Sequence, residues 1–346
     1  MRGAAPQVAV VGAGGWGTAL AVMLARAGRR VTLWARRPQH AARLAAQRVN
    51  EPYLPGIPIP AGVRVSADLE EAAQAPFILL AVPSQAVRAT WRALAPHLGV
   101  GHTVAIAAKG LEIGTGLRLS QVIASEPGPL PPSRIAVLSG PNHAEEVGRG
   151  LPTTSVVAAS DPRTGEAWQE LLMNSSFRVY TNDDVIGVEL GGALKNVIAL
   201  GAGISDGLGF GDNTKAALIT RGLAEMARLG AALGARVLTF SGLSGMGDLI
   251  ATCTSEHSRN ARAGRAIGAG TPPEEVVAGT PMVIEGIPTC RAALQLARAA
   301  GVEMPITEAV GAVLFDGKPP RQAVSELMGR GPKDELAAIL APPAPW

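Results

Sequence analysis

The sequence predicts an α/β protein with two domains, a mostly parallel β-sheet domain followed by an all-helical domain. From residue 7 to about residue 181, short β-branched runs alternate with alanine- and leucine-rich helical patterns, which is typical of βαβ units. After Thr181 the strand patterns stop and long helical patterns follow. A chain of 346 residues also exceeds what one hydrophobic core usually serves. We therefore expect one domain over residues 1–182 and a second over residues 183–346.

The strands expected in the first domain are apolar throughout near its centre, as buried parallel strands are. They cover residues 7–11, 30–34, 63–65, 77–82, 103–107, 134–138, 154–159 and 177–181. The polar run from Asn182 to Asp184 is expected to cap the first helix of the second domain. The helices expected there cover residues 184–203, 212–233, 258–268, 286–300, 305–315 and 320–329. Residues 50–60 predict a proline-rich loop, and the tail 341–346 is expected to be disordered.

The composition favours a soluble enzyme or binding protein over several other classes. Hydrophobic residues make up 47% of the chain and charged residues 17%, which fits a folded protein rather than a disordered one. Few aromatic residues, at 3%, and a net charge of only +3 argue against a nucleic-acid partner. Cys253 and Cys290 cannot build a disulfide framework, which indicates a reducing cytoplasm. We expect no signal peptide, no membrane-spanning segment and no metal site.

A glycine motif follows the first predicted strand and opens the first predicted helix. Residues 8–25 read VAVVGAGGWGTALAVMLA, with Gly12, Gly14 and Gly17 in the spacing G-x-G-x-x-G. In such a motif the first glycine allows a tight turn, the second lets the backbone approach a pyrophosphate, and the third lets the helix pack on the strand. The strand and helix context makes the pattern more specific than its glycines alone. It predicts a Rossmann-like domain that binds a dinucleotide.

The end of the second predicted strand indicates which dinucleotide is bound. Folds specific for NAD carry an acidic residue there, which binds the ribose 2′-hydroxyl. In this chain the strand RVTLW runs into Ala35, Arg36 and Arg37 instead. Two guanidinium groups suit a 2′-phosphate, so the sequence favours NADP(H) and leaves use of NAD(H) open. A solvated loop is the alternative interpretation of the two arginines.

Lys195 is the candidate proton donor. Reduction of a ketone by hydride leaves negative charge on oxygen, so the site needs a proton donor and a nearby cation. Lys195 lies in the otherwise apolar helical segment GGALKNVIALGAG, where burial is expected to lower its pKa. The alternative is a lysine whose stem merely lines the core. The histidines are expected in surface or loop contexts: His40, His97, His102, His143 and His257.

Two further segments carry polar groups suited to a substrate. Lys109 follows the apolar strand TVAIAA, at the sheet edge where ligands bind in open α/β folds, although an exposed loop lysine is equally compatible. Residues 241–260 read SGLSGMGDLIATCTSEHSRN and include Asp248. Ser258 is expected to cap a helix whose first turn carries Arg259 and Asn260, which makes an anion site suited to a phosphate. A surface position is the alternative for Arg259.

From Val8 to about Asp334 the sequence resembles the soluble NAD(P)-dependent glycerol-3-phosphate dehydrogenase family. The segment GALKNVIA, followed later by GDL and SRN, is far more specific than the glycine motif. The stretches that carry the resemblance are GAGGWGTALA, AAKGLE (107–112), LSGPNHAEEV (138–147), residues 177–226, GDLIATCTSEHSRN and GVEMPITEAV (301–310).

The resemblance implies specific roles at matching positions. Lys195 resembles the residue that transfers the proton, Asp248 would orient and charge-pair it, and Lys109 completes the catalytic set. Substrate-binding positions are matched by Lys109, Gly140, Asn142, Lys195, Asp248, Ser258, Arg259 and Asn260. Cofactor positions are matched by Gly12, Gly14, Gly15, Trp16, Gly17, Arg36, Arg37, Tyr53, Lys109, Ala144, Arg259, Val283 and Glu285. Asn142 departs from the Ser or Thr of many members, and Gly15-Trp16 from a common serine-aromatic pair.

The family further implies a helical domain similar to the C-terminal domain of 6-phosphogluconate dehydrogenase. It implies reversible, NAD(P)H-dependent reduction of the triose phosphate dihydroxyacetone phosphate to glycerol 3-phosphate, for glycerophospholipid synthesis, by a cytoplasmic homodimer. The rival interpretations are a ketopantoate or β-hydroxyacid reductase, a sugar-nucleotide dehydrogenase with Cys253 as nucleophile, and an NADP-binding sensor without turnover. A buried structural cysteine is the simpler interpretation of Cys253.

Overall fold

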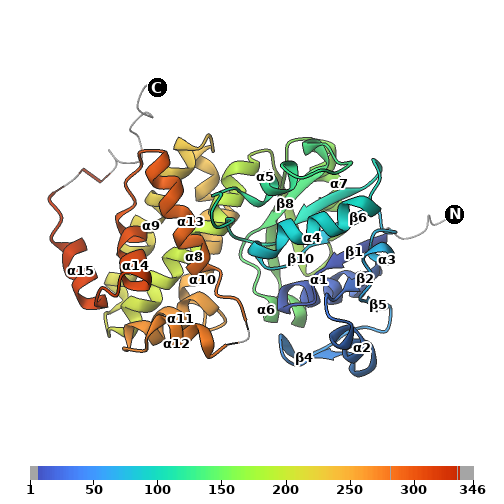
Figure 1. Ribbon diagram of the computed structural model, residues 1–346, viewed down its shortest axis with the longest axis horizontal. Coiled ribbons are helices and arrows are strands. Elements are labelled where there is room, and N and C mark those ends of the chain that lie inside the picture. The colour runs from blue at the N-terminus through green and yellow to red at the C-terminus, as the bar shows by residue number, and fades with distance from the viewer. Residues whose placement is uncertain (1–6, 281, 333, 336–346) are drawn as a thin grey trace. The chain divides into compact units, whose positions relative to one another are not determined.

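The computed structural model describes residues 7–280, 282–332 and 334–335, which form two compact units (Figure 1). The sheet unit holds the chain up to Ala108 together with Leu119–Val185. The helical unit holds Lys109–Arg118 together with the chain from Ile186 onward. The predicted boundary after residue 182 left the segment 109–118 in the first domain, whereas the fold assigns it to the helical unit.

The sheet unit is built on an eight-stranded sheet with the order β10-β9-β8-β7-β6-β1-β2-β5. Neighbouring strands are parallel except β8 and β9, which are antiparallel. This confirms the predicted mostly parallel sheet and all eight predicted strands. The strands are β1 (Gln7–Val11), β2 (Arg30–Trp34), β5 (Val63–Ser66), β6 (Phe77–Leu80), β7 (Thr103–Ile106), β8 (Ile135–Ser139), β9 (Thr153–Ala159) and β10 (Phe177–Asn182).

Strand β1 lies at the point where the strand order reverses. The chain passes from β1 to β2 on one side, and then crosses back to add β6 on the other side of β1. In open α/β sheets, ligands bind beyond the carboxyl end of the strands at such a switch point. The topology therefore places the glycine motif, which directly follows β1, where a dinucleotide is expected.

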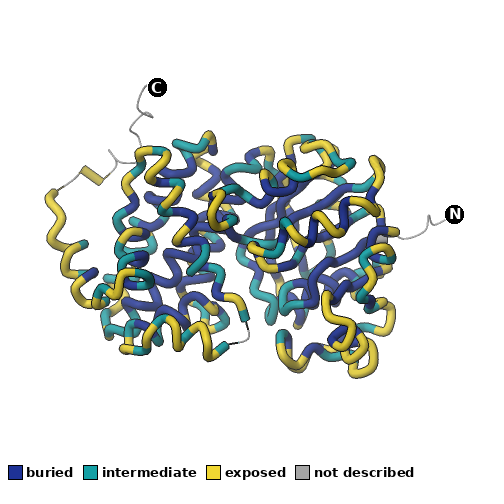
Figure 2. Tube along the Cα trace, in the orientation of Figure 1, coloured by how far each residue is buried: buried dark blue, intermediate teal, exposed yellow. Residues whose placement is uncertain are grey.

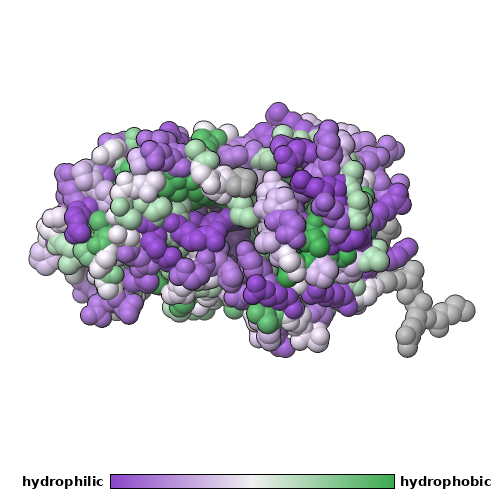
Figure 3. Space-filling view, turned by 90° about the horizontal axis from the view of Figure 1, so that it is seen from below, coloured by the Kyte–Doolittle hydropathy of each residue, from purple (hydrophilic) through white to green (hydrophobic). Residues whose placement is uncertain are grey.

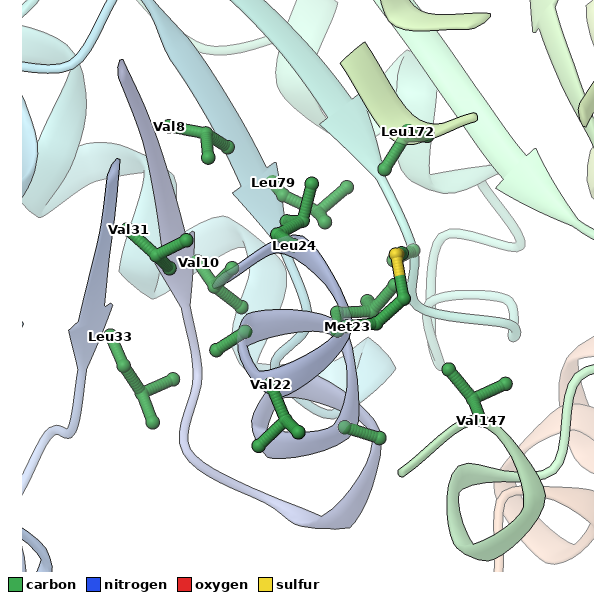
Figure 4. Packing of buried hydrophobic residues seen from close by; sticks show 14 of the residues in the cluster. Val8, Val10, Val22, Met23, Leu24, Val31, Leu33, Leu79, Val147 and Leu172 are labelled. Carbon is green, nitrogen blue, oxygen red and sulfur yellow. The ribbon is translucent and has the colours of Figure 1, made fainter. Parts of the chain in front are cut away.

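Helix α1 (Gly15–Arg26) packs its apolar face on the sheet. Figure 4 shows side chains of β1, β2 and α1 gathered in one cluster, with Leu79 of β6 and Val147 of α6 around it. Complete burial of one valine or leucine side chain stabilises a fold by about 1.5–3 kcal/mol, so this cluster anchors the turn between β1 and α1. The other helices of the unit are α2 (Pro38–Gln47), α3 (Leu69–Ala72), α4 (Val87–Leu94), α5 (Leu119–Ala124), α6 (Ala144–Arg149) and α7 (Pro162–Leu172).

The proline-rich stretch 50–60 is more ordered than the predicted loop. Strands β3 (Val49–Asn50) and β4 (Leu54–Pro58) form a small antiparallel pair. Proline lacks a backbone N–H group. It is tolerated in such a pair because residues on the outer edge of a strand need not donate a hydrogen bond. The prediction of a loop was wrong because β3 and β4 are too short to show the alternating pattern that marks a longer hairpin.

In the part of the helical unit that the structure describes, the six predicted helices are present, together with two short ones that the sequence analysis missed. The missed helices are α10 (Asp248–Thr254) and α12 (Pro273–Ala278), which are too short to show a clear period. A π-helical turn over residues Leu243–Gly247 leads into α10. The remaining helices are α8 (Val185–Gly207), α9 (Asp212–Ala232), α11 (Arg259–Gly268), α13 (Gly286–Ala299), α14 (Pro305–Phe315) and α15 (Pro320–Met328).

Helix α8 forms the core of the helical unit. Its residues are almost all buried, as the dark blue of this helix in Figure 2 illustrates. Among the described residues it is the one helix long and apolar enough to cross a membrane, but its burial is that of a core helix. At its start, the Asn182 side chain accepts a hydrogen bond of 2.8 Å from the amide of Asp184.

In the face shown in Figure 3, hydrophilic residues dominate and hydrophobic ones occupy small separate areas. Single exposed apolar side chains of this kind are usual on folded proteins. The predicted disorder of residues 341–346 falls outside the described residues.

Candidate active site

The glycine motif forms a tight turn between β1 and α1. Gly12 has a φ of +125°, and a Cβ atom there would lie 2.6 Å from the carbonyl oxygen of Ala81. A Cβ atom on Gly17 would lie 1.8 Å from the carbonyl oxygen of Gly12. Only glycine fits at these two positions, so helix α1 can start close to the strand. The first amides of a helix have no partner within it, which makes this turn a fitting site for a pyrophosphate.

Several predicted cofactor residues meet around the start of α1. Asn50 fixes the β3–β4 pair there, because its side-chain nitrogen donates to the Ala13 carbonyl at 3.0 Å and to the Thr18 hydroxyl at 2.7 Å. A Cβ atom on Gly15 would lie 2.5 Å from the carbonyl oxygen of Tyr53 and 3.9 Å from the Cβ of Ala144. Trp16 is half-buried and packs against the core of the sheet unit.

The two predicted 2′-phosphate ligands are exposed just beyond β2. Arg37 donates a hydrogen bond of 3.2 Å to the hydroxyl of Tyr53, and Arg36 is exposed beside it. The Tyr53 ring also meets the edge of His40 at a centroid distance of 5.7 Å. The hydrogen bond ties Arg37 to the segment that borders the glycine turn.

His40 is not a surface residue, which corrects the expectation from the sequence. It lies on the buried face of α2 with Ala41 and Leu44. Burial lowers the pKa of His40, and nearby Arg43 and Arg37 lower it further, while a hydrogen bond to Ala13 opposes them. The neutral imidazole of His40 therefore has a structural role beside the loop that carries Arg36 and Arg37.

Gly140 and Asn142 follow strand β8 in the sheet unit. Gly140 has a φ of +123°, and a Cβ atom there would lie 3.0 Å from the Cα of Ser155. Asn142 is buried, and its side-chain nitrogen donates to the Ser155 hydroxyl at 3.0 Å. The structure thus brings Gly140 and Asn142 together against β9.

The central feature of the helical unit is a carboxylate held between two ammonium groups. Lys195 of α8 donates to Oδ1 of Asp248 at 2.5 Å, and Lys109 donates to Oδ2 at 2.8 Å. Lys195 also donates to the hydroxyl of Thr252 at 2.7 Å. Lys195 and Asp248 are buried, and the Lys109 side chain is 15% exposed. The three residues predicted to be catalytic are therefore in direct contact.

Small residues on α8 allow this contact. A Cβ atom on Gly191 would lie 2.7 Å from the carbonyl oxygen of Ser244, in the turn that precedes α10. Farther along α8, a Cβ atom on Gly203 would lie 2.1 Å from the carbonyl oxygen of Ala261 on α11. Close approach of these backbones brings the first residue of α10, Asp248, to the face of α8 that carries Lys195.

Burial and the neighbouring charges both shift the pKa values of Asp248 and Lys109. Burial disfavours the ionised form of Asp248, but Lys109 and Lys195 outweigh it and keep the pKa of Asp248 below its ordinary value. Burial lowers the pKa of Lys109 to about 8, against the opposing attraction of Asp248. The carboxylate thus stays ionised near neutral pH, while Lys109 titrates close to it.

The residues of the predicted anion site lie at the start of α11. Ser258 caps this helix by accepting a hydrogen bond of 3.1 Å from the amide of Ala261, as predicted. Arg259 is exposed, and it donates to the carbonyl oxygen of Val283 at 3.1 Å. Val283 and Glu285 precede α13, so the predicted cofactor positions of this unit lie beside the candidate phosphate site.

A chain of buried amides joins these segments, and the sequence analysis missed its central member. Asn196 donates to the Lys109 carbonyl at 3.3 Å and accepts from Asn260 at 2.9 Å. Asn260 in turn accepts from the amide of Gly286 at 2.9 Å. Asn196 and Thr252 could have been suspected as buried polar residues near Lys195 and Asp248, but their partners depend on tertiary packing.

Cys253 does not fit the role of an activated nucleophile. It is buried on α10, and burial raises the pKa of its thiol to about 12, although Lys195 lowers it in part. A thiol with this pKa stays protonated at neutral pH. These properties support Cys253 as a small core residue and argue against a role as the nucleophile of a sugar-nucleotide dehydrogenase.

Two family models match the chain in succession. The N-terminal part of NAD-dependent glycerol-3-phosphate dehydrogenase matches residues 7–165, and the C-terminal part matches residues 184–325. Together they span both units.

Individual relatives extend over nearly the whole chain. The glycerol-3-phosphate dehydrogenase [NAD(P)+] of Moorella thermoacetica is 57% identical over 324 residues, which is 93% of this chain and 96% of that protein. The protein of the same name from Desulfitobacterium hafniense is 54% identical over 96% of this chain and 94% of its own. The crystal structure of glycerol-3-phosphate dehydrogenase from Coxiella burnetii covers 94% of this chain and 99% of its own, at a TM-score of 0.90 and 41% identity. A ketopantoate reductase from Ralstonia eutropha has a TM-score of 0.58 at 19% identity, which indicates a shared fold alone.

Proposed function

The chain belongs to the NAD-dependent glycerol-3-phosphate dehydrogenase family, and from this we propose that it reduces dihydroxyacetone phosphate to glycerol 3-phosphate reversibly with NADPH or NADH. The observation that carries the proposal is the buried carboxylate of Asp248 between Lys109 and Lys195. Such a cluster supplies what ketone reduction needs, a proton donor and fixed positive charge near a developing alkoxide.

The sheet unit has the residues to hold the dinucleotide. The pyrophosphate would bind at Gly12, Gly14 and the first amides of α1, and Arg36 with Arg37 would bind the ribose end. When bound, the nicotinamide supplies or accepts a hydride. The arginine pair and the absence of an acid after β2 favour NADP(H), while NAD(H) is also accepted.

Lys195 handles the proton. In the direction of reduction, the ammonium group of Lys195 donates its proton to the substrate oxygen as the C–O⁻ group forms, and it takes the proton back in oxidation. Asp248 holds the Nζ atom in place and stays ionised, because the neighbouring lysines keep its pKa low. Lys109 contributes a second cation that stabilises negative charge on the same oxygen.

The start of α11 would bind the phosphate of the substrate. Arg259 supplies a charge, the helix N-terminus supplies amides, and Ser258 orders the turn. Asn196 and Asn260 connect this turn to the backbone of Lys109. These two amides would thus connect the phosphate site to the segment that carries Lys109.

The first experiment follows absorbance of reduced nicotinamide while the purified protein is mixed with NADPH and dihydroxyacetone phosphate. Unphosphorylated dihydroxyacetone is the control. We expect rapid consumption of NADPH with the phosphate ester and at most a small fraction of that rate with the control. Turnover with ketopantoate or another 2-oxoacid instead would favour the hydroxyacid reductases, and NADPH binding without any turnover would favour the sensor.

We also propose that the protein works in the cytoplasm as a homodimer and that its product supplies glycerophospholipid synthesis. Two buried thiols and the absence of a disulfide among the described residues support the reducing compartment. Sedimentation velocity tests the dimer, and loss of phospholipid synthesis after depletion of the protein, with rescue by glycerol 3-phosphate, tests the metabolic role.

A further inference from the structure

The segment from Lys109 to Arg118 leaves the sheet unit after β7 and returns to it at α5, yet it belongs to the helical unit. It folds back on itself, because Leu111 and Arg118 form an antiparallel bridge and the amide of Glu112 donates to the Leu117 carbonyl at 3.0 Å. One end of this small hairpin carries Lys109. The position of Lys109 therefore depends on how the hairpin is attached.

The hairpin is attached along one face of α8. Leu111 is buried in the apolar core of the helical unit. At one polar attachment, Asn196 donates to the Lys109 carbonyl at 3.3 Å. At a second polar attachment, Arg118 donates to Oε2 of Glu189 at 2.5 Å. Glu189 and Asn196 are seven residues apart, about two helical turns, so both lie on the same face of the helix about 10 Å apart.

We propose that the buried ion pair between Arg118 and Glu189 is a positioning contact, which fixes the far end of this hairpin on α8 and so sets the Lys109 side chain against Asp248. This proposal rests on the proposed function only because that function gives Lys109 a role at the substrate. Arg118 and Glu189 act through Lys109 and do not contact the reacting atoms themselves.

The geometry of the pair supports a positioning role. The side chains of Arg118 and Glu189 are only 14% and 6% exposed. A buried ion pair contributes little net stability over an apolar pair, but its directional hydrogen bonds specify one arrangement. Without it, the end of the hairpin at Arg118 would lose this directional contact with α8, while the Leu111 contact and the 3.3 Å hydrogen bond from Asn196 remain at the other end. The hairpin could then shift along α8 and carry Lys109 away from the carboxylate.

The test uses Arg118→Met, which removes the charge and keeps an apolar stem, and Arg118→Lys, which restores a cation. If Arg118→Met folds poorly, Glu189→Gln disrupts the ion pair from the other side and keeps a hydrogen-bond acceptor. Arg88→Met is the matched control. It breaks an ion pair with Glu126 in the sheet unit, and the two side chains there are 22% and 6% exposed.

The decisive readout does not need turnover. Lys109 is labelled with an amine-acylating reagent across a pH series, and the labelled peptide is quantified by mass spectrometry. In the parent protein, half-maximal labelling is expected near pH 8, since burial lowers the pKa of Lys109 to about 8 from an ordinary 10.5. Arg118→Met and Glu189→Gln should move that midpoint upward by about one pH unit, as Lys109 gains solvent. Arg118→Lys should move it less, and Arg88→Met should leave it unchanged.

Turnover gives the second readout. For Arg118→Met, kcat/KM for dihydroxyacetone phosphate should fall at least about tenfold, and Arg118→Lys should recover part of the loss. A labelling midpoint that stays near pH 8 in both Arg118→Met and Glu189→Gln would overturn the positioning role. A parent protein that does not turn over dihydroxyacetone phosphate would overturn the proposed function, while the labelling midpoints would still decide the attachment.

Discussion

The ammonium group of Lys195 lies 2.5 Å from Oδ1 of Asp248, although the two residues are 53 positions apart in the chain. A carboxylate so deeply buried stays ionised because two ammonium groups lie against it. The same contact therefore compensates a buried charge and also holds the proposed proton donor in place. This coupling makes Asp248 a sensitive position for both properties.

We predict that Asp248→Asn loses both activity and stability. The neutral amide leaves two buried ammonium groups side by side, so the free energy of unfolding should fall by about 3 kcal/mol. Turnover of dihydroxyacetone phosphate should fall at least about 100-fold. Denaturant unfolding and steady-state kinetics measure the two effects. Asp316→Asn, which changes an exposed aspartate of the same unit, should alter neither.

Lys195→Ala should abolish most catalysis while cofactor binding persists. Removal of the proton donor is expected to lower kcat by about 10²–10⁴-fold. Lys195→Arg keeps the positive charge but cannot release a proton near neutral pH, so it should be nearly as inactive. NADPH binding, followed by fluorescence titration, should stay close to that of the parent protein. Substantial turnover by either variant would place the proton donor elsewhere.

Local sequence patterns were sufficient to predict the strands, the glycine turn and the long helices. Each of these depends on a period or a turn requirement within about 20 residues. Ser258 as a helix cap is of the same kind, because a cap bonds an amide three residues away. Likewise, Lys195 was recognisable as a polar residue in an apolar helix.

Other features depend on packing between distant segments and could not be read from local patterns. The pairing of Lys109 with Asp248 requires the hairpin 109–118 to join the helical unit, which no linker composition marks. The contact of Asn196 with Lys109 has the same origin. His40 was misjudged because a polar residue in a short helix gives little indication of which face is buried.

Arg259→Ala should weaken recognition of the phosphate selectively. Loss of a charge at the start of α11 is expected to raise KM for dihydroxyacetone phosphate at least about tenfold, since charge-assisted bonds to phosphate are among the strong ones. The small activity with unphosphorylated dihydroxyacetone should change little. Arg262→Ala is the matched control, because Arg262 is an exposed arginine one turn farther along the same helix. Equal losses for both substrates would contradict the phosphate assignment.

The double variant Arg36→Ala/Arg37→Ala should change cofactor preference. Two guanidinium groups at the end of β2 suit a 2′-phosphate that NADH lacks, so kcat/KM for NADPH should fall by at least about tenfold and that for NADH much less. Both cofactors are compared at saturating dihydroxyacetone phosphate. A single Arg30→Ala variant, at the exposed start of the same strand, should leave the preference unchanged. Equal losses for NADPH and NADH in the double variant would rule out the 2′-phosphate assignment.

Glu225 should make stability depend on pH without taking part in catalysis. This buried residue of α9 accepts hydrogen bonds from the amides of Ile306 and Thr307, at the start of α14, at 2.6 and 3.2 Å. Burial raises its pKa to about 7, although these hydrogen bonds lower it in part. The folded state therefore holds a proton that the unfolded state releases above its ordinary pKa of 4.5.

Because of this difference, the Glu225 contribution is fully present below about pH 4.5 and is lost as the pH rises towards 7, by roughly 3 kcal/mol. Glu225→Gln, which cannot ionise, should remove this slope from a plot of unfolding free energy against pH. Glu308→Gln, which removes an exposed carboxylate from the first turn of α14, should keep the slope of the parent protein. Parallel curves for the parent and Glu225→Gln would mean that Glu225 is ionised across this pH range, with its charge held by the amides of α14.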